Sequence, residues 1–263
     1  MTRSLLGRIL INLFVTVNVF GWIPVLISGE PAGQAKHQKF LVALDIGHTP
    51  NHAGAMAADG TMEYEFNRRM VELIAADLRQ QPNIAVIVVN GQRKEISLFQ
   101  RSAIANESSA DLFLSVHHDS ANDRYLVPRL VDGRKLYSTD KFHGYSIFFS
   151  EKNADAANSL RFAKLIGAAL RQEGLDPTTH HAEKIPGENR ELVVPELGVY
   201  RFDNLIVLRT TKMPAALLEC GVIVNPAEEE ELRQPERQLK VVRAVRDAVL
   251  TMASKESRKA ELP

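Results

Sequence analysis

Cysteine is nearly absent from this sequence, and its scarcity restricts the available chemistry. Cys220 is the only cysteine among the 263 residues. A single thiol excludes an intramolecular disulfide framework and any zinc site built from cysteines alone. We expect Cys220 to be a small buried strand residue rather than a nucleophile with a histidine partner.

The sequence also lacks a surplus of either charge. It holds 32 basic and 32 acidic residues, and no long block of one sign occurs in it. Proteins that bind nucleic acids usually carry a basic surplus or a basic stripe. The balance therefore argues against nucleic acid as a partner.

One long apolar run is present, at the N-terminus. Arg3 and Arg8 precede residues 9–27, which contain no charged residue, and small residues follow as far as Ala35. This order is typical of a secretory signal cleaved after Ala35, although the run is also long enough for an uncleaved membrane anchor. We therefore expect residues 1–39 to be a signal peptide or anchor plus a linker, and the protein to be exported.

From residue 40 onward, short apolar runs alternate with amphipathic helical patterns. The hydrophobic share of 45% and the charged share of 24% are ordinary for a globular domain. The alternation predicts one α/β domain over 40–253 with a mixed, mostly parallel sheet, two irregular stretches at 119–143 and 176–203, and a polar tail at 254–263. The expected apolar runs are 40–46, 84–89, 112–116, 145–149, 205–208 and 215–218. The expected helices are 63–78, 97–107, 155–172, one from Pro226 with Asn225 and Glu228 as a capping pair, and one from Pro235.

Four residues with chemical capability lie at strand ends or at a helix start. His48 and His117 follow apolar runs, Glu63 opens a helix, and Glu219 ends another apolar run. Two imidazoles and a carboxylate around an open position are a typical catalytic zinc set. A further carboxylate, not bound to the metal, can move the proton of a water molecule.

Glu219 fits this fourth role. It lies in a stretch so apolar that its carboxylate is costly unless it is paired or coordinated. The alternative is a glutamate that emerges at the strand end and binds an arginine or a backbone amide.

Each proposed ligand has a rival nearby. His52 competes with His48, Glu65 competes with Glu63, and His118 lies directly beside His117. His118 should point to the opposite side of the strand, because side chains alternate. His180 and His181 lie in the long polar stretch, where exposure to solvent is the default and substrate contact the second interpretation.

Taken in order, these stretches resemble the zinc-dependent N-acetylmuramoyl-L-alanine amidases of the type 3 family, across most of residues 40–250. Leu44–His48 is similar to the family's Asp-x-Gly-His opening, and Glu63 with Asn67 to its Glu-x-x-x-Asn helix start. The other matching pieces are 97–111, Ser115–His117, 207–209, 214–221 and 225–228.

The resemblance implies a roughly six-stranded sheet with helices on both faces. It implies one zinc ion held by His48, Glu63 and His117, with Glu63 preferred to Glu65 by its place before Asn67, and Glu219 as the catalytic carboxylate. The reaction would be hydrolysis of the amide between N-acetylmuramic acid and L-alanine in peptidoglycan or in a muropeptide, in the periplasm. Substrate-binding residues and an activator protein are not identified by the sequence.

Two departures from the family pattern change the rim of the expected pocket. Residues 49–52 replace the usual Gly-Gly and Asp after the first histidine, and His118-Asp119 replaces the usual Ala-Asn or Ala-Asp. The short segment 150–155 leaves no room for the blocking helical insertion that some members carry. The alternatives are a zinc peptidase acting on stem peptides and a non-catalytic wall-binding protein of the same fold.

Overall fold

The computed structural model describes residues 39–260, with side chains as far as Ser254. The predicted signal or anchor, with all but the last residue of its linker, lies outside the described residues. Among the helices of the described part, none is both long enough and apolar enough to span a membrane.

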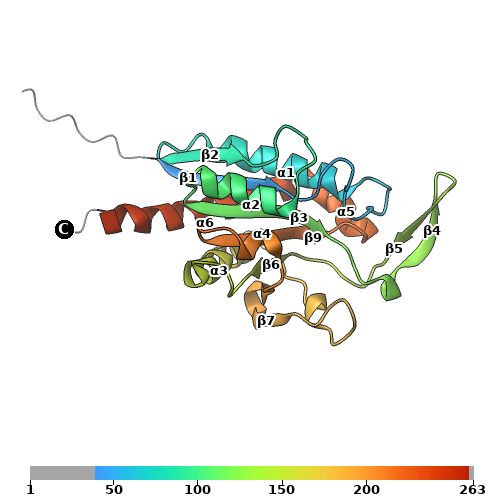
Figure 1. Cartoon of the computed structure of the whole chain (residues 1–263). Helices are drawn as coiled ribbons and strands as arrows, with labels where there is room; N and C mark the ends of the chain where they lie inside the picture. Colours follow the sequence, from blue (N-terminus) through green and yellow to red (C-terminus); the bar gives the residue numbers. More distant parts are fainter. Residues whose placement is uncertain (1–38, 261–263) are drawn as a thin grey trace, which may run out of the picture. The chain divides into compact units, whose positions relative to one another are not determined.

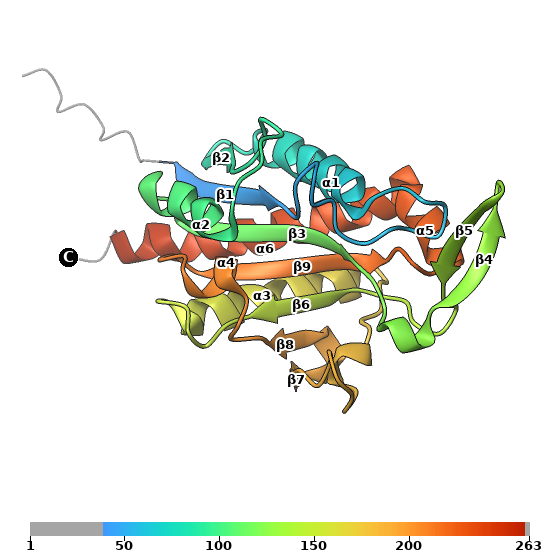
Figure 2. The same cartoon turned by 45° about the vertical axis from the view of Figure 1, so that its right-hand side comes forward.

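The described chain forms a seven-stranded sheet in the order β2-β1-β3-β9-β6-β8-β7 (Figures 1 and 2). Neighbouring strands in β2-β1-β3-β9 pair in parallel, β6 is antiparallel to β9 and parallel to β8, and β7 is antiparallel to β8. The mixed, mostly parallel sheet is therefore confirmed, with one strand more than six. The strands are β1 Phe40–Ile46, β2 Ile84–Val88, β3 Leu112–Asp119, β6 Ser146–Phe149, β7 Glu191–Val194, β8 Val199–Arg201 and β9 Ala215–Val222.

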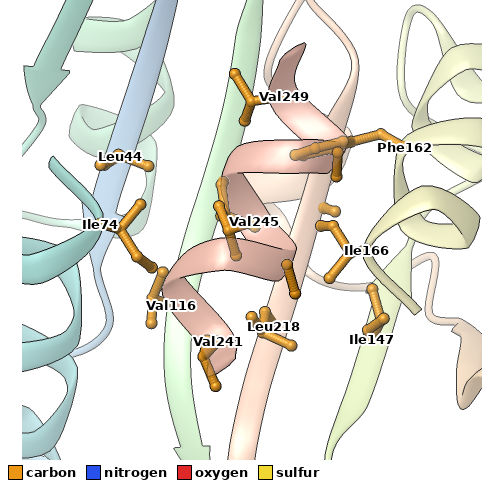
Figure 3. Close-up of a cluster of buried hydrophobic side chains, with 14 of the residues drawn as sticks. Leu44, Ile74, Val116, Ile147, Phe162, Ile166, Leu218, Val241, Val245 and Val249 are labelled. Atoms are coloured by element: carbon orange, nitrogen blue, oxygen red, sulfur yellow. The ribbon is translucent and has the colours of Figure 1, made fainter. Parts of the chain in front are cut away.

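Helices cover both faces of this sheet, because alternate strand residues point to opposite sides. On one face, Leu44 of β1 packs in a cluster with α1 Glu63–Leu78, α3 Ala156–Gln172 and α6 Pro235–Ala260. Figure 3 shows Val245 of α6 at the centre of that cluster. On the other face, Ala43 packs in a cluster with α2 Leu98–Glu107 and α4 Ile206–Arg209. Each fully buried aliphatic side chain stabilises the fold by roughly 1.5–3 kcal/mol.

Capping residues set two of the helix starts as expected. The Ser97 hydroxyl accepts a hydrogen bond from the Gln100 amide at 3.2 Å, and the Gln100 side chain accepts one from the Ser97 amide. Asn225 caps α5 Pro226–Arg233 in a similar way. The expected capping pair at α5 is only half formed, because the Glu228 carboxylate accepts hydrogen bonds from the Gly144 and Val222 amides instead.

Three predictions of local structure were wrong. The stretch 119–143 contains the hairpin β4 Val127–Val131 and β5 Arg134–Ser138, which projects beyond the main sheet (Figure 2). Asp132 and Gly133, both with positive φ, form its two-residue turn, a hairpin signal that the prediction overlooked. The stretch 176–203 contains β7 and β8.

The apolar run 205–208 is not a strand, since most of it lies in α4. This short helix buries Val207 and Leu208 against the sheet, so tertiary packing overrides a sequence rich in β-branched residues. At the C-terminus, α6 continues to Ala260, past the expected start of the tail at 254.

Candidate active site

Two parallel strands and one helix start bring the predicted ligands to the same edge of the sheet. Ile46 of β1 pairs with Val116 of β3, so His48, just past the end of β1, and His117, the residue after Val116, lie side by side. Glu63 is the first residue of α1, and its carboxylate faces both rings. The carboxyl ends of parallel strands are where α/β proteins build their sites.

The three side chains converge closely. Glu63 Oε2 lies 3.0 Å from His48 Nε2, and Glu63 Oε1 lies 3.0 Å from His117 Nδ1. One ligand atom from each residue lies within 4.8 Å of the other two. Burial alone would raise the pKa of Glu63, but hydrogen bonds to His117 and His48, and their charges, hold this pKa well below its ordinary value.

The rival residues do not join this cluster. Glu65 lies on the outer side of α1, where it pairs with Arg68 at 3.0 Å and with Arg93 at 3.3 Å. The side chain of His52 is 87% exposed and lies 3.3 Å from Glu95. The geometry thus favours Glu63 over Glu65 and His48 over His52.

Two glycines make room for the cluster. A Cβ atom at Gly47 would lie 2.6 Å from the His117 ring, and one at Gly54 would lie 2.3 Å from Glu63 Oε2. Gly54 also has a φ of +77°, which side-chain-bearing residues rarely adopt. With two imidazoles and a carboxylate facing one another, the donor set and its close-fitting walls suit a zinc ion.

A buried ion pair holds the backbone that carries His48. Arg101 donates to Asp45 Oδ1 at 2.7 Å and also to the carbonyl oxygens of Ile46 and His48. Asn90 donates to the Ile46 carbonyl oxygen at 2.8 Å. These contacts fix His48 at a φ of 67°. Sequence reasoning placed Arg101 in a family motif without a role and missed Asn90, because their contacts are with atoms more than 40 positions away in the sequence.

Asn67 orients Glu63 from behind. Its amide nitrogen donates to Glu63 Oε1 at 3.0 Å and to the Gly47 carbonyl oxygen at 3.2 Å. Its Oδ1 lies 2.8 Å from Nδ1 of His118, which points away from the cluster as alternation predicts. Burial lowers the pKa of His118 to about 3, so this ring is neutral at ordinary pH.

Glu219 lies beside the cluster on the neighbouring strand. It is the register partner of His117 in the pairing of β3 with β9. Its Oε2 is sealed from solvent and has no hydrogen-bond partner within the described residues. Burial, followed by the charges of Asp119 and Glu63, raises the pKa of Glu219 well above its ordinary value. The alternative, a pairing with an arginine or a backbone amide, is not made by this buried oxygen within the described residues.

The cluster borders an open cleft of about 470 Å³. His48 and His117 line one part of it, and Ser97, Leu98 and Ile206, at the starts of α2 and α4, line another. A substrate carbonyl entering this cleft would meet the imidazoles.

The prediction that His180 and His181 are exposed was wrong. Both side chains pack against Asp119 at the end of β3, and they are only 1% and 13% exposed. Burial would lower the pKa of His181, but the charge and hydrogen bonds of Asp119 and Glu188 raise it to about 9.

Cys220 is buried, as expected, and burial raises the pKa of its thiol far above the ordinary value, which disfavours the thiolate that a nucleophile needs.

Comparison with known proteins gives a consistent result. Residues 42–251 match the family model described as N-acetylmuramoyl-L-alanine amidase. The germination-specific N-acetylmuramoyl-L-alanine amidase of Bacillus subtilis is 27% identical over 222 residues, which cover 80% of this chain and 78% of that protein. The N-acetylmuramoyl-L-alanine amidase AmiA of Escherichia coli K12 is 23% identical over 248 residues, covering 84% and 79% respectively.

A solved structure has the same fold. The crystal structure of an N-acetylmuramoyl-L-alanine amidase from Clostridium difficile 630 superimposes with a TM-score of 0.65 at 22% identity, covering 83% of this chain and 99% of that one. The segment 150–155 between β6 and α3 is short, as the sequence indicated, so no helix is inserted there.

Proposed function

Since the chain belongs to the N-acetylmuramoyl-L-alanine amidase family, we propose that it hydrolyses the amide between N-acetylmuramic acid and L-alanine with one zinc ion held by His48, Glu63 and His117. Membership of the family supports amidase action on peptidoglycan. The proposal adds the zinc ion and the roles of the individual residues. The observation that carries them is the convergence of the three side chains beside Glu219, whose Oε2 has no hydrogen-bond partner among the described residues, at the edge of an open cleft.

A zinc ion in such a site polarises a carbonyl and lowers the pKa of a bound water molecule. His48, Glu63 and His117 would hold that ion, with Asn67 keeping Glu63 in place. Arg101 would keep His48 turned toward the site through the His48 carbonyl oxygen. Second-layer contacts of this kind orient metal ligands.

Glu219 would move the proton. It would accept a proton from the attacking water as the new C–O bond forms, and return it to the L-alanine nitrogen as the C–N bond breaks. Its raised pKa makes it a stronger base once ionised and a competent acid afterwards. The products would be a free lactyl carboxylate and a stem peptide with a free L-alanine amine.

The test is digestion of purified sacculi by the full-length chain, with and without a zinc chelator, followed by mass spectrometry. Stem peptides that begin with a free L-alanine amine, released only without the chelator, support the proposal. Cuts inside the stem would favour the peptidase alternative. If the chain binds sacculi but releases nothing from sacculi or from soluble muropeptides, it is a wall-binding protein instead.

The setting of this reaction is proposed from the same family membership. Peptidoglycan lies outside the inner membrane, so residues 1–39 would export the chain to the periplasm, either as a cleaved signal or as an anchor to that membrane. The absence of an inserted helix between β6 and α3 leaves the cleft unblocked from that position. The proposed partner is therefore the wall or a muropeptide, with nucleic acid disfavoured by charge.

A further inference from the structure

A second cluster of metal-ligand side chains lies near the end of β3, separate from the site proposed above. Asp119 ends β3, and His180 and His181 open the short helix η2 His180–Ala182. Asp119 Oδ2 lies 2.7 Å from His181 Nε2 and 3.4 Å from His180 Nε2. One ligand atom from each residue lies within 4.8 Å of the other two.

The other polar atom of each side chain is already held by a neighbour. Asp119 Oδ1 accepts a hydrogen bond from the Ser120 amide at 2.8 Å. His180 Nδ1 lies 2.8 Å from the Thr178 hydroxyl, and His181 Nδ1 lies 2.9 Å from Glu188 Oε2. Metal-ligating histidines characteristically bond through their second ring nitrogen to a carboxylate or another oxygen. Both histidines show this pattern, with their Nε2 atoms turned to the same oxygen, Asp119 Oδ2.

His180 supplies an independent sign of a missing ligand. Its side chain is 1% exposed, and its Nε2 has no hydrogen-bond partner in the described part of the chain. A buried polar nitrogen without a partner is unfavourable. An ion pair between His181 and Asp119 would leave this nitrogen unsatisfied, whereas a shared cation would satisfy it.

The charges point the same way. The side chains of Asp119 and Glu188 are only 10% and 12% exposed. Within residues 39–254 their ion-pair partners are His180 and His181, and neither carboxylate contacts a lysine or an arginine side chain. A buried carboxylate and a largely buried one beside two imidazoles make a site that a divalent cation would neutralise.

We propose that Asp119, His180 and His181 bind a second divalent metal ion, with zinc as the expected occupant. The ligand side chains are at most 13% exposed, which limits access to the ion and favours a structural role, and a fourth ligand would complete the tetrahedral set of such a site. Asp119 and His181 are 62 positions apart, so the ion would fasten the segment 176–203 to the end of β3, two residues beyond His117.

Zinc stoichiometry, measured by inductively coupled plasma mass spectrometry after removal of free metal, tests the proposal. The probe is Zn²⁺ alone, and the sample is the full-length chain in detergent. The variant H48A/H117A destroys the first cluster and leaves the second intact. We expect this variant to retain one equivalent of zinc, and to lose it when H180Q and H181Q are added.

The matched control is His52→Gln, which alters an exposed histidine outside both clusters and should leave the stoichiometry unchanged. Thermal unfolding supplies the second readout, since zinc should raise the Tm of H48A/H117A and leave that of the quadruple variant unmoved. An H48A/H117A chain that binds no zinc and shows no rise in Tm would overturn the proposal. Retention of zinc by the quadruple variant would also overturn it, because the ion would then lie elsewhere.

Discussion

Two clusters of two histidines and one carboxylate lie near the C-terminal end of β3, and they differ in their access to solvent. In the first cluster, the side chain of His48 is 33% exposed and borders the 470 Å³ cleft. In the second cluster, the side chain of His180 is 1% exposed. The same kind of donor set therefore suits chemistry in one place and cross-linking in the other.

The neighbours of each cluster reinforce this difference. The first cluster has Glu219 beside it, whose Oε2 is buried and has no hydrogen-bond partner in the described part of the chain, and Glu219 is the proton carrier that we propose. In the second cluster Glu188 is committed to His181, and Thr178 to His180. Access to solvent and the neighbouring Glu219 carboxylate, rather than the ligand residues themselves, distinguish the proposed catalytic site from the proposed structural one.

The largest effect is expected from His48→Ala. This change removes one ligand of the first cluster and none of the second. We expect zinc in the first cluster and amide hydrolysis to be lost together, with activity falling at least about 1,000-fold, because the site would supply neither metal nor geometry. Activity assays on sacculi, paired with zinc analysis, measure both. Full activity in His48→Ala would remove the distinction drawn between the clusters.

A large effect on stability is expected from Arg101→Met. The guanidinium is buried and pairs with Asp45 at 2.7 Å, so its removal leaves an unpaired buried carboxylate. Breaking such a pair typically costs about 3–5 kcal/mol. Urea unfolding measures the change in the free energy of unfolding. Arg68→Met is the control, since Arg68 pairs with Glu65 and Glu72 at the surface and should cost under about 1 kcal/mol.

A moderate, local effect is expected from Gly54→Ala. The new Cβ would lie 2.3 Å from Glu63 Oε2, so Glu63 must move and zinc affinity at the first cluster should fall roughly 10–100-fold. Gly133→Ala is the matched control, because Gly133 has nearly the same φ, +76°, with nothing within 4 Å of the added atom. Titration with a zinc indicator separates the two variants. Equal affinities in both variants would mean that Glu63 accommodates the added methyl group, which would contradict the close fit of Gly54 against Glu63.

The smallest effect is expected from His52→Gln. His52 is exposed and contacts Glu95 at the cleft rim, so hydrolysis should change less than about 3-fold. Steady-state assays of kcat and KM on a muropeptide measure this. A loss comparable to that of His48→Ala would contradict the placement of His52 outside the first cluster.

The first cluster was accessible from the sequence because each member adjoins a regular element. The patterns predict His48 just after one buried strand, His117 at the end of another and Glu63 at the start of an amphipathic helix, and the family resemblance selects them from their neighbours. The buried central strands of the sheet were predicted for the same reason, because each is a short apolar run. The second cluster was not accessible, because His180 and His181 lie in a stretch without periodicity, which gives no indication of the strand end that they approach.

The most direct test is the variant Glu219→Gln, which keeps the shape of the side chain but cannot carry the proton. We predict that hydrolysis of the muramoyl–L-alanine amide falls about 100–10,000-fold while zinc content equals that of the unaltered chain. Undiminished hydrolysis would contradict the role of Glu219. Loss of zinc together with activity would contradict it as well, because Glu219 would then be a ligand and not the proton carrier.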